Sequence, residues 1–305
     1  MQIGFAGSPE LAATTLEALL QSGRKPDIVL TQPPRRSGRR RAIQRTPVHE
    51  LAETNGLEVA TPVRLKGCEH LVDTLDLLIV AAYGLILPRS ILEAPRLGCI
   101  NVHPSLLPRW RGASPVEHAI LHGDTITGVS IMRVEPALDS GPVYATSTYE
   151  MKGNETTASL TSCLARIGAR LLLEVMRGFD DGSLPCPTPQ DTSMATYAPQ
   201  LKPEQARIDW SKPATILERH VRAFLGRSPA FTTKGGIRLR ILCSRVVEGC
   251  YTPGSIYRQR KSVIVGCGLG GLELNTVQLN RGKGTPLPIA SALNGYGEVF
   301  TGAFA

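Results

Sequence analysis

Short apolar runs alternate with helix-forming segments through the first hundred residues of the chain. The runs occupy residues 2–6, 27–31, 57–60, 77–82 and 99–102. Uninterrupted apolar runs of this length are typical of strands in a parallel sheet, because the helices that connect such strands cover both of its faces. After the first run, Pro9 suits the first turn of a helix and Gly23 suits its end. The alternation therefore predicts an α/β fold built on a mostly parallel sheet.

The pattern changes after about residue 180. Before that point, further strands are expected at 128–134 and 143–149, followed by a long helix with an apolar stripe that ends at Gly178. Three prolines within 182–190 and no apolar periodicity predict an extended linker that reaches about residue 207. A helix from Pro213, capped by Ser211, and several short strands separated by Gly and Pro turns follow it. We therefore expect a first domain at 1–182, a linker at 183–207 and a small β-barrel domain at 208–305.

Positive charge is concentrated in two regions that are far apart in the sequence. Residues 205–305 contain 14 basic and 5 acidic side chains, whereas residues 1–204 are close to neutral with 20 basic and 21 acidic side chains. Within the first part, the segment 33–45 combines six arginines with Pro-Pro and Gly and contains almost no apolar residue. Such a loop gains little from packing, and its charge attracts partners rich in phosphate.

Composition excludes several classes of protein. The chain is 42% hydrophobic and 20% charged, which excludes a disordered chain and a coiled coil. Its longest uncharged apolar stretch, 77–88, is too short to span a bilayer, and the N-terminus enters an apolar strand without a signal peptide. Seven scattered cysteines without a CxxC pair favour reduced thiols in a cytoplasm over a zinc ribbon or a disulfide framework.

Two polar side chains at the end of one predicted strand are candidates for catalysis. Because side chains alternate along a strand, Asn101 and His103 project to the same side, and Pro104 ends the strand directly after them. Ligands of open α/β sheets bind at the carboxyl ends of the strands. The amide can donate to a developing oxyanion and the imidazole can move a proton near neutral pH. Alternatively, both residues only satisfy backbone groups of a loop.

Asp139 is the candidate for the second half of this site. It also lies just past a predicted strand, and the Gly141-Pro142 pair that follows forces a turn that can hold a carboxylate inward. Beside His103, it would orient the imidazole and stabilise its protonated form. Its spacing fits equally well with a turn-forming residue that has no catalytic role.

The chain resembles the folate-dependent formyltransferase family over essentially its whole length, and within it the branch that acts on charged initiator tRNA. The matching segments are 5–9 (FAGSP), 31–33 (TQP), 82–88 (AYGLILP), 101–112 (NVHPSLLPRWRG), 138–142 (LDSGP) and 208–211 (IDWS). The resemblance implies a Rossmann-like first domain and an OB-like second domain. It implies transfer of a formyl group from 10-formyltetrahydrofolate to the amino group of methionyl initiator tRNA, through a tetrahedral intermediate. We also expect a monomer, located in the cytoplasm. No metal is expected, because the folate nitrogen is an adequate leaving group once it is protonated.

The resemblance also assigns roles to individual residues. It implies that Asn101, His103 and Asp139 are the catalytic trio. The folate pocket would be lined by Tyr83, Gly84, Leu85, Ile86, Leu87, Pro88, Ser105, Leu106, Leu107, Pro108 and Leu138. The basic insertion, residues 32–45, would enter the major groove of the acceptor stem. The tRNA contacts would come from Arg36, Arg39, Arg40, Arg41, Arg238 and Arg240.

Other functions remain open at this point. A related formyltransferase that acts on a small amine, such as a sugar nucleotide or glycinamide ribonucleotide, would have the same trio but would need neither basic region. A NAD-linked oxidoreductase would need a dinucleotide fingerprint. The G-x-G-x-x-G match at 266–271 precedes an alternating strand pattern and not a helix, so we expect a hairpin turn there. A non-catalytic tRNA-binding protein would leave the trio unexplained.

His118 and His122 have the spacing of zinc ligands, but no third ligand is near them in sequence, so we expect surface residues.

Overall fold

The chain folds into two compact units. The computed structural model describes residues 1–37, 42–183, 186–226, 228–281 and 284–304. The first unit comprises Met1–Pro115, Ile126–Glu150 and Thr161–Ala198, and the second comprises Val116–Thr125, Met151–Leu160 and Pro199–Ala305. The chain therefore enters the second unit three times, and these boundaries differ from the simple division near residue 182 that the sequence predicts.

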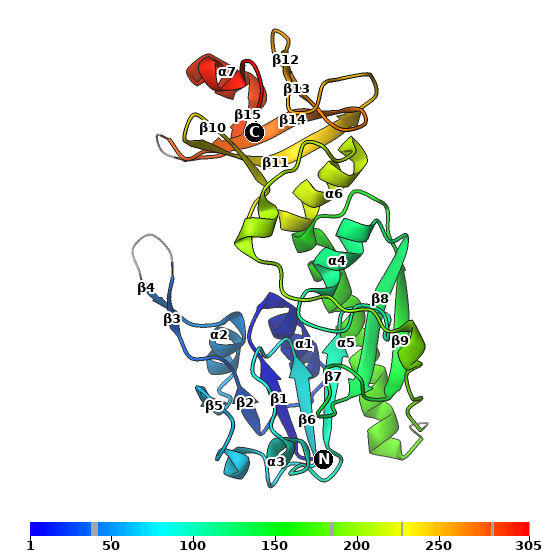
Figure 1. The fold of residues 1–305 in the computed structure, drawn as a ribbon. Helices are drawn as coiled ribbons and strands as arrows, with labels where there is room; N and C mark the ends of the chain where they lie inside the picture. The colour runs from blue at the N-terminus through cyan, green and yellow to red at the C-terminus, as the bar shows by residue number, and fades with distance from the viewer. Residues whose placement is uncertain (38–41, 184–185, 227, 282–283, 305) are drawn as a thin grey trace. The chain divides into compact units, whose positions relative to one another are not determined.

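The elements up to the long helix combine strands with connecting helices, and β2–β4 and β8–β9 follow one another without a helix between them (Figure 1). In chain order they are β1 (Ile3–Gly7), α1 (Glu10–Gln21), β2 (Ile28–Leu30), β3 (Arg35–Ser37), β4 (Ala42–Gln44), α2 (Pro47–Thr54), β5 (Val59–Ala60), a 3-10 turn (Glu69–Leu71), β6 (Leu77–Ala81), α3 (Arg89–Leu92), β7 (Cys99–His103), α4 (Pro115–His122), β8 (Ile126–Arg133), β9 (Val143–Glu150) and α5 (Thr157–Asp181).

Seven of these strands form one sheet in the order β5-β2-β1-β6-β7-β8-β9. The first five are parallel to one another, β8 is antiparallel to β7, and β9 is antiparallel to β8. The strand order reverses direction between β1 and β6, and ligands of open α/β sheets bind at the carboxyl ends of the strands at such a point. The fold class predicted for this part, a Rossmann-like and mostly parallel sheet, is confirmed.

The two faces of this sheet are packed differently. On one face, two glycines show how closely helices approach the sheet. A Cβ added to Gly7 of β1 would lie 2.6 Å from the Cβ of Ala12 in α1. A Cβ added to Gly168 of α5 would lie 2.8 Å from the side chain of Val102 in β7. The opposite face carries a separate apolar core that includes Leu78, Val80 and Cys99. Register places Asn101 and His103 of β7 on this second face, the one that α5 does not cover.

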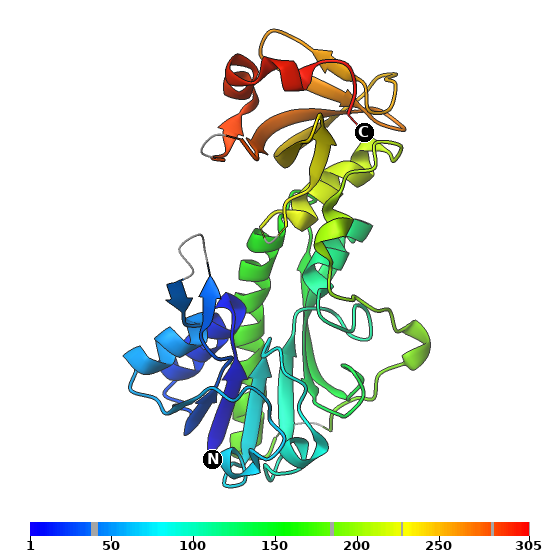
Figure 2. The same cartoon turned by 60° about the vertical axis from the view of Figure 1, so that its left-hand side comes forward.

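The basic insertion contains regular structure on both sides of its tip. The sequence predicts a loop at 32–45, but β3 and β4 pair antiparallel, with Arg35 opposite Gln44. The two strands stand out from the unit beside α2 (Figures 1 and 2). These strands contain few apolar side chains, and that of Ile43 is 70% exposed. Because they lack an alternation of apolar and polar residues, the sequence pattern does not predict them. Arg39, Arg40 and Arg41 lie outside the described residues, and only the backbone of Arg36 is described.

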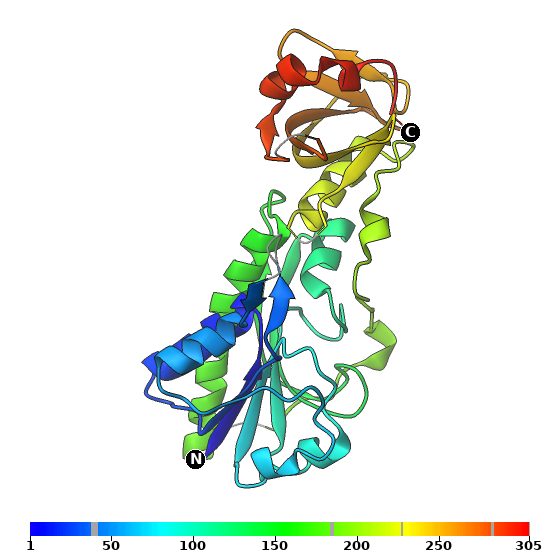
Figure 3. The same ribbon diagram turned by 90° about the vertical axis from the view of Figure 1, so that its left-hand side faces the viewer.

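The second unit contains a strongly curled antiparallel sheet, a half-barrel that Figure 3 shows in the upper part of the view. Its strands run in the order β10-β11-β14-β13-β12, with β15 paired to β14. The prediction of a small OB-like barrel domain is confirmed as this open, curled form. The elements of this region are a 3-10 turn (Pro203–Ala206), α6 (Ala214–Phe224), β10 (Phe231–Lys234), β11 (Ile237–Val247), β12 (Ile256–Arg258), β13 (Val263–Gly266), β14 (Gly271–Leu279), β15 (Leu287–Pro288), α7 (Ile289–Gly295) and a final 3-10 turn (Gly297–Phe300).

Two local predictions in this unit have different outcomes. The G-x-G-x-x-G segment joins β13 to β14 as a hairpin in which Gly266 pairs with Gly271, so the hairpin expected there is confirmed. The prediction that Ser211 caps α6 is wrong. The helix begins at Ala214 after Pro213, and the Ser211 hydroxyl donates to Asp209 instead, at 2.6 Å. A short Asx-type turn competes successfully for that hydroxyl.

Candidate active site

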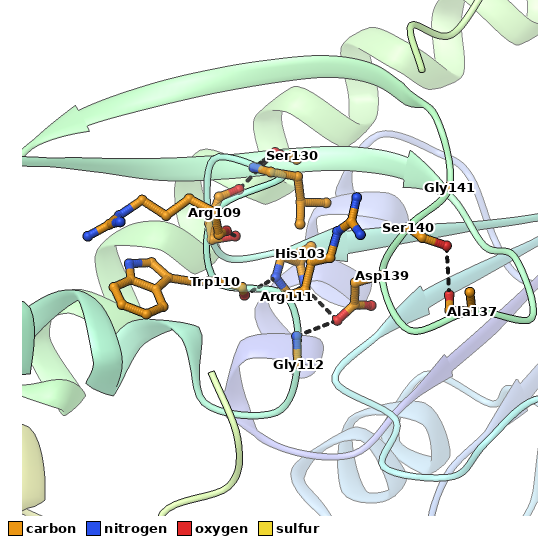
Figure 4. Close-up of polar contacts among 12 residues, drawn as sticks. His103, Arg109, Trp110, Arg111, Gly112, Ser130, Ala137, Asp139, Ser140 and Gly141 are labelled. Carbon is orange, nitrogen blue, oxygen red and sulfur yellow. Dashed lines mark hydrogen bonds and ion pairs between the residues drawn. The ribbon is translucent and has the colours of Figure 1, made fainter. Parts of the chain in front are cut away.

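A histidine at the end of β7 and an aspartate from the loop between β8 and β9 face each other at the carboxyl end of β7. His103 is the last residue of β7, and Asp139 lies in the loop between β8 and β9. The Nδ1 atom of His103 lies 3.7 Å from Oδ2 of Asp139, and both side chains point into the same space (Figure 4). The histidine side chain is only 4% exposed and that of the aspartate 18%.

A turn after β7 fixes the other edge of the imidazole. The chain doubles back over residues 104–110, so that the carbonyl oxygen of Trp110 lies 3.0 Å from Nε2 of His103. This hydrogen bond requires a proton on Nε2, and it leaves Nδ1 as the nitrogen that faces Asp139. The two ring nitrogens therefore face the carbonyl oxygen of Trp110 and the carboxylate of Asp139.

The aspartate is held from two directions. Its Oδ2 atom accepts a hydrogen bond of 2.8 Å from the backbone N–H of Gly112. Its backbone has a φ of 46°, in the left-handed region that aspartate tolerates better than most residues. Gly141 allows the return of the chain, since a Cβ there would lie 2.0 Å from the carbonyl oxygen of Arg133. The Gly141-Pro142 turn predicts an inward carboxylate, and the side chain of Asp139 points toward His103 (Figure 4).

Asn101 lies one strand repeat before His103, on the same face of β7, and is half-buried. Its register partners are Val80 on β6 and Met132 on β8. The amide is therefore on the side of the sheet that carries the His103–Asp139 pair. Asn101 and His103 thus lie on one face of β7, on the side where Asp139 approaches the imidazole.

The segments expected to line a folate pocket lie at the same edge of the sheet, but their side chains differ in exposure. Residues 82–88 follow β6 beside the strand-order reversal. Tyr83 is 2% exposed and belongs to the apolar core on that face, where burial raises the pKa of its hydroxyl to about 12. Ile86 and Leu138, in contrast, are 92% and 62% exposed. Each of these two apolar side chains is therefore exposed on its loop, where a ligand could cover it.

The loop 105–108 is supported by a residue that the sequence analysis missed. Ser130 is the register partner of His103 on β8 and is fully buried. Its hydroxyl donates to the carbonyl of Ser105 at 2.8 Å and accepts from the N–H of Leu107 at 3.1 Å. Ser105 in turn donates to the carbonyl of Arg109. No sequence signal marks Ser130, because its partners are backbone groups of another strand's loop.

The positions proposed for tRNA contacts fall on the insertion and on β11. Arg238 lies over the ring of Phe231 at 4.2 Å, and Arg240 donates to Gln278 at 3.1 Å. Both guanidinium groups are thus held against the curled sheet.

No group of three or more His, Cys, Asp or Glu side chains within the described ranges could hold a metal ion. The ring of His118 bonds the carbonyl oxygen of Pro199, and the ring of His122 bonds the carbonyl oxygen of His118. None of the described helices is both long and apolar enough to cross a lipid bilayer.

Comparison with known proteins places this geometry in a family. Residues 1–176 match the model "Formyl transferase" and residues 200–297 match "Formyl transferase, C-terminal domain". A methionyl-tRNA formyltransferase of Methylococcus capsulatus is 46% identical over 284 residues, which cover 91% of this chain and 92% of the relative. One from Dechloromonas aromatica is 41% identical and covers 97% and 96%. The crystal structure of HypX from Aquifex aeolicus in complex with tetrahydrofolic acid shares the fold, with a TM-score of 0.64 at 19% identity over 96% of this chain and 47% of that one. The match of both domain models, together with relatives above 40% identity along nearly the full length, shows that this chain belongs to the formyltransferase family and, within it, to the methionyl-tRNA formyltransferases.

Proposed function

We propose that this protein transfers a formyl group from 10-formyltetrahydrofolate to the α-amino group of methionyl initiator tRNA. The observation that carries the proposal is the identity of 41–46% to methionyl-tRNA formyltransferases through both units of the chain. The His103–Asp139 pair at a strand end supplies chemistry that fits it. A small amine as acceptor is the less supported alternative, because it would leave the two basic regions without a role.

The reaction exchanges one carbon–nitrogen bond for another. The amine nitrogen forms a bond to the formyl carbon, and the bond from that carbon to N10 of the folate breaks. The amine loses one proton and N10 gains one, so the protein has to move a proton without consuming any. A free α-amino group has a pKa near 8, so a large fraction is neutral and nucleophilic at pH 7.5.

The His103–Asp139 pair is suited to that proton transfer. Nε2 of His103 donates its proton to the carbonyl oxygen of Trp110. The Nδ1 proton faces Oδ2 of Asp139, and the 3.7 Å between Nδ1 and Oδ2 is longer than a normal hydrogen bond. The pair can therefore give this proton to the departing N10 and take up the proton that the amine releases. Catalytic hydrogen bonds are often long without substrate and shorten in the reacting complex. We assign His103 as the proton-transfer group and Asp139 as the residue that orients it and balances its charge.

Asn101 is assigned to the oxygen of the formyl group. When the amine attacks, this oxygen becomes negatively charged, and an amide N–H aimed at it stabilises the transition state more than the ground state. Asn101 and His103 share one face of β7, so a formyl carbon beside the imidazole also lies beside the amide. Removing one such donor typically costs about 10²–10³ in rate.

The folate would lie at the strand-order reversal, along residues 82–88 and the loop before Asp139. Ligands bind at this place in open α/β sheets. The exposed side chains of Ile86 and Leu138 offer apolar cover for a flat aromatic ring system. Tyr83 enters this proposal through its backbone only, because its ring is packed in the core. The remaining positions assigned by resemblance are Gly84, Leu85, Leu87, Pro88, Ser105, Leu106, Leu107 and Pro108.

The tRNA would bind through the basic insertion and the basic second unit. Arg36, Arg39, Arg40 and Arg41 belong to the insertion, and Arg238 and Arg240 to β11. The excess of 14 basic over 5 acidic residues in 205–305 favours binding to the phosphate backbone of RNA, because binding releases counterions.

We also propose that the protein acts as a monomer in the cytoplasm, where charged tRNA and reduced folate are present.

A formyl-transfer assay tests the function directly. Purified protein is given 10-formyltetrahydrofolate with one of four acceptors: methionyl initiator tRNA, methionyl elongator tRNA, glycinamide ribonucleotide or an amino sugar nucleotide. We expect rapid formylation of the initiator tRNA only, with kcat/KM for each of the other three acceptors at least 100-fold lower. Preferential formylation of a small amine, with no product on initiator tRNA, would overturn the proposal in favour of the alternative.

A further inference from the structure

Residues 188–198, called the strap below, run along the active site even though the sequence suggests a free linker. At one end, Thr188 exchanges two backbone hydrogen bonds of 2.8 Å with Val143 at the start of β9. At the other end, Ala198 donates to the carbonyl of Arg111 at 2.7 Å and accepts from the N–H of Ser114. The strap therefore touches both loops that carry the catalytic pair, the one after β7 and the one before β9.

Gln190 is the strap residue whose side chain joins these two loops. Its Nε2 donates to the carbonyl of Asp139 at 2.9 Å and to that of Gly141 at 2.7 Å. Its Oε1 accepts from Nε and Nη2 of Arg111 at 3.0 and 2.7 Å. Arg111 is 4% exposed and is the neighbour of both Trp110, which bonds His103, and Gly112, which bonds Asp139.

This contact requires an amide. The two acceptors on the aspartate loop face the NH2 group, and the guanidinium donors face the oxygen, so the orientation of the side chain is fixed from both sides. A carboxylate of the same shape would keep the contact with Arg111 but would place an oxygen against two carbonyls. An apolar side chain would leave the buried guanidinium and the carbonyls of the loop without this partner.

The aspartate loop needs such support. Asp139 has the left-handed φ of 46°, and its carboxylate must stay near His103 while substrates enter and leave. A conformation of this kind persists only where the surroundings hold it. The side chain of Gln190 bonds the backbone on both sides of this turn, at Asp139 itself and at Gly141.

We propose that Gln190 is a positioning residue for the formyl transfer, which locks the Asp139 loop to Arg111 and so sets the separation between Asp139 and His103. This inference rests on the proposed function for its kinetic consequences and on the contacts above for its geometry. Gln190 acts through the backbone of Asp139 and does not itself touch the reacting atoms. Arg111 is the buried anchor of the same contact.

The test compares Gln190→Leu and Gln190→Glu with the wild-type protein, with Asp191→Ala as the matched control. Asp191 is the next residue of the strap, is exposed and bonds Ser193 within its own turn. We expect both Gln190 variants to lose about 10- to 100-fold in kcat, since a displacement near 1 Å is enough for such a loss. The KM values for folate and for tRNA should stay within about 2-fold of wild type, and Asp191→Ala should keep full activity.

The comparison of kcat with KM tests the positioning role. A displaced Asp139 slows the chemical step but leaves the folate and tRNA sites in place, so kcat should fall while both KM values stay near wild type. Wild-type kcat in Gln190→Leu, or an equal loss in Asp191→Ala, would each overturn the proposal.

Crystal structures of the wild type and Gln190→Leu give a readout that does not depend on activity. We expect the Asp139 carboxylate to lie farther from Nδ1 of His103 in the variant, while the sheet is unchanged. An unchanged loop would overturn the positioning role. A wild-type protein that fails to formylate initiator tRNA would overturn the proposed function instead, so the two failures can be told apart.

Discussion

The Nδ1 atom of His103 and the Oδ2 atom of Asp139 lie 3.7 Å apart at the edge of the sheet, and the same carboxylate oxygen accepts from Gly112. The substitution Asp139→Asn tests the charge alone. Asparagine keeps an acceptor for Gly112 and also tolerates the left-handed backbone. We expect kcat for formyl transfer to fall by about 10²-fold or more, with the melting temperature within a few degrees of wild type. Glu135→Gln, an exposed charge change in the same loop, is the control and should keep wild-type kcat.

The amide of Asn101 should matter for the chemical step more than for binding. We expect Asn101→Ala to lower kcat by about 10²–10³ while the KM for folate changes little, because the oxyanion exists only in the transition state. Single-turnover formylation of initiator tRNA measures the step directly. Asn154→Ala, at an exposed asparagine, should react at the wild-type rate, and a rapid Asn101→Ala reaction would remove this residue from the mechanism.

Ser130 supports the loop 105–108 from inside the protein. Replacing it with alanine leaves the carbonyl of Ser105 and the N–H of Leu107 without this buried partner. We expect the free energy of unfolding to fall by about 1–3 kcal/mol, measured by urea titration, and the KM for folate to rise. Thr148→Ala, at an exposed position of β9, should change neither quantity. A folate KM that does not respond to Ser130→Ala would separate this loop from the folate site.

The proposed tRNA contacts predict a specific response to salt. Each phosphate contact that is lost should reduce the slope of log KM for tRNA against log salt by about one unit. We expect Arg238→Ala, and separately the triple replacement of Arg39, Arg40 and Arg41 by alanine, to raise this KM and flatten the slope. Arg245→Ala is the control on the same strand, because that side chain is already paired with Glu273. Equal slopes in all variants would exclude these arginines as phosphate contacts.

His220 should make the second unit sensitive to acid. Its ring stacks on Phe224 with centroids 4.5 Å apart, and burial lowers the pKa of the imidazole below its ordinary value of 6.5. The unfolded chain therefore takes up a proton more readily, so stability is full above pH 6.5 and is lost as the pH falls below it. We expect the urea midpoint of the transition that includes this unit to fall between pH 7.5 and 5.5. His220→Gln should reduce that fall, and an equally steep fall in the variant would place its origin elsewhere.

The elements that the sequence predicts well are those whose signal is local. The parallel strands, the long helix α5 and the hairpin at Gly266 and Gly271 all follow from periodicity and turn residues within a few positions. The strands β3 and β4 were missed because an arginine-rich segment has no apolar alternation to detect. Ser211 was assigned to the wrong partner because a cap and an Asx-type turn use the same residue types.

The candidate site divides in the same way. Asn101 and His103 could be placed on one face from strand alternation alone, and the turn at Gly141 indicated an inward Asp139. Gln190 and Ser130 could not be found, because each bonds backbone atoms of segments far away in the sequence, and such contacts leave no pattern. A proline-rich stretch predicts an extended chain correctly in kind, but not the surface along which that chain is bound.

The path of the strap determines where the protein can be divided. Because residues 188–198 belong to the first unit, a chain cut at the apparent end of α5 would lose part of its catalytic scaffold as well as its second unit. A junction after Ala198 would keep the strap with the catalytic pair, but it would still divide the second unit, which also contains Val116–Thr125 and Met151–Leu160.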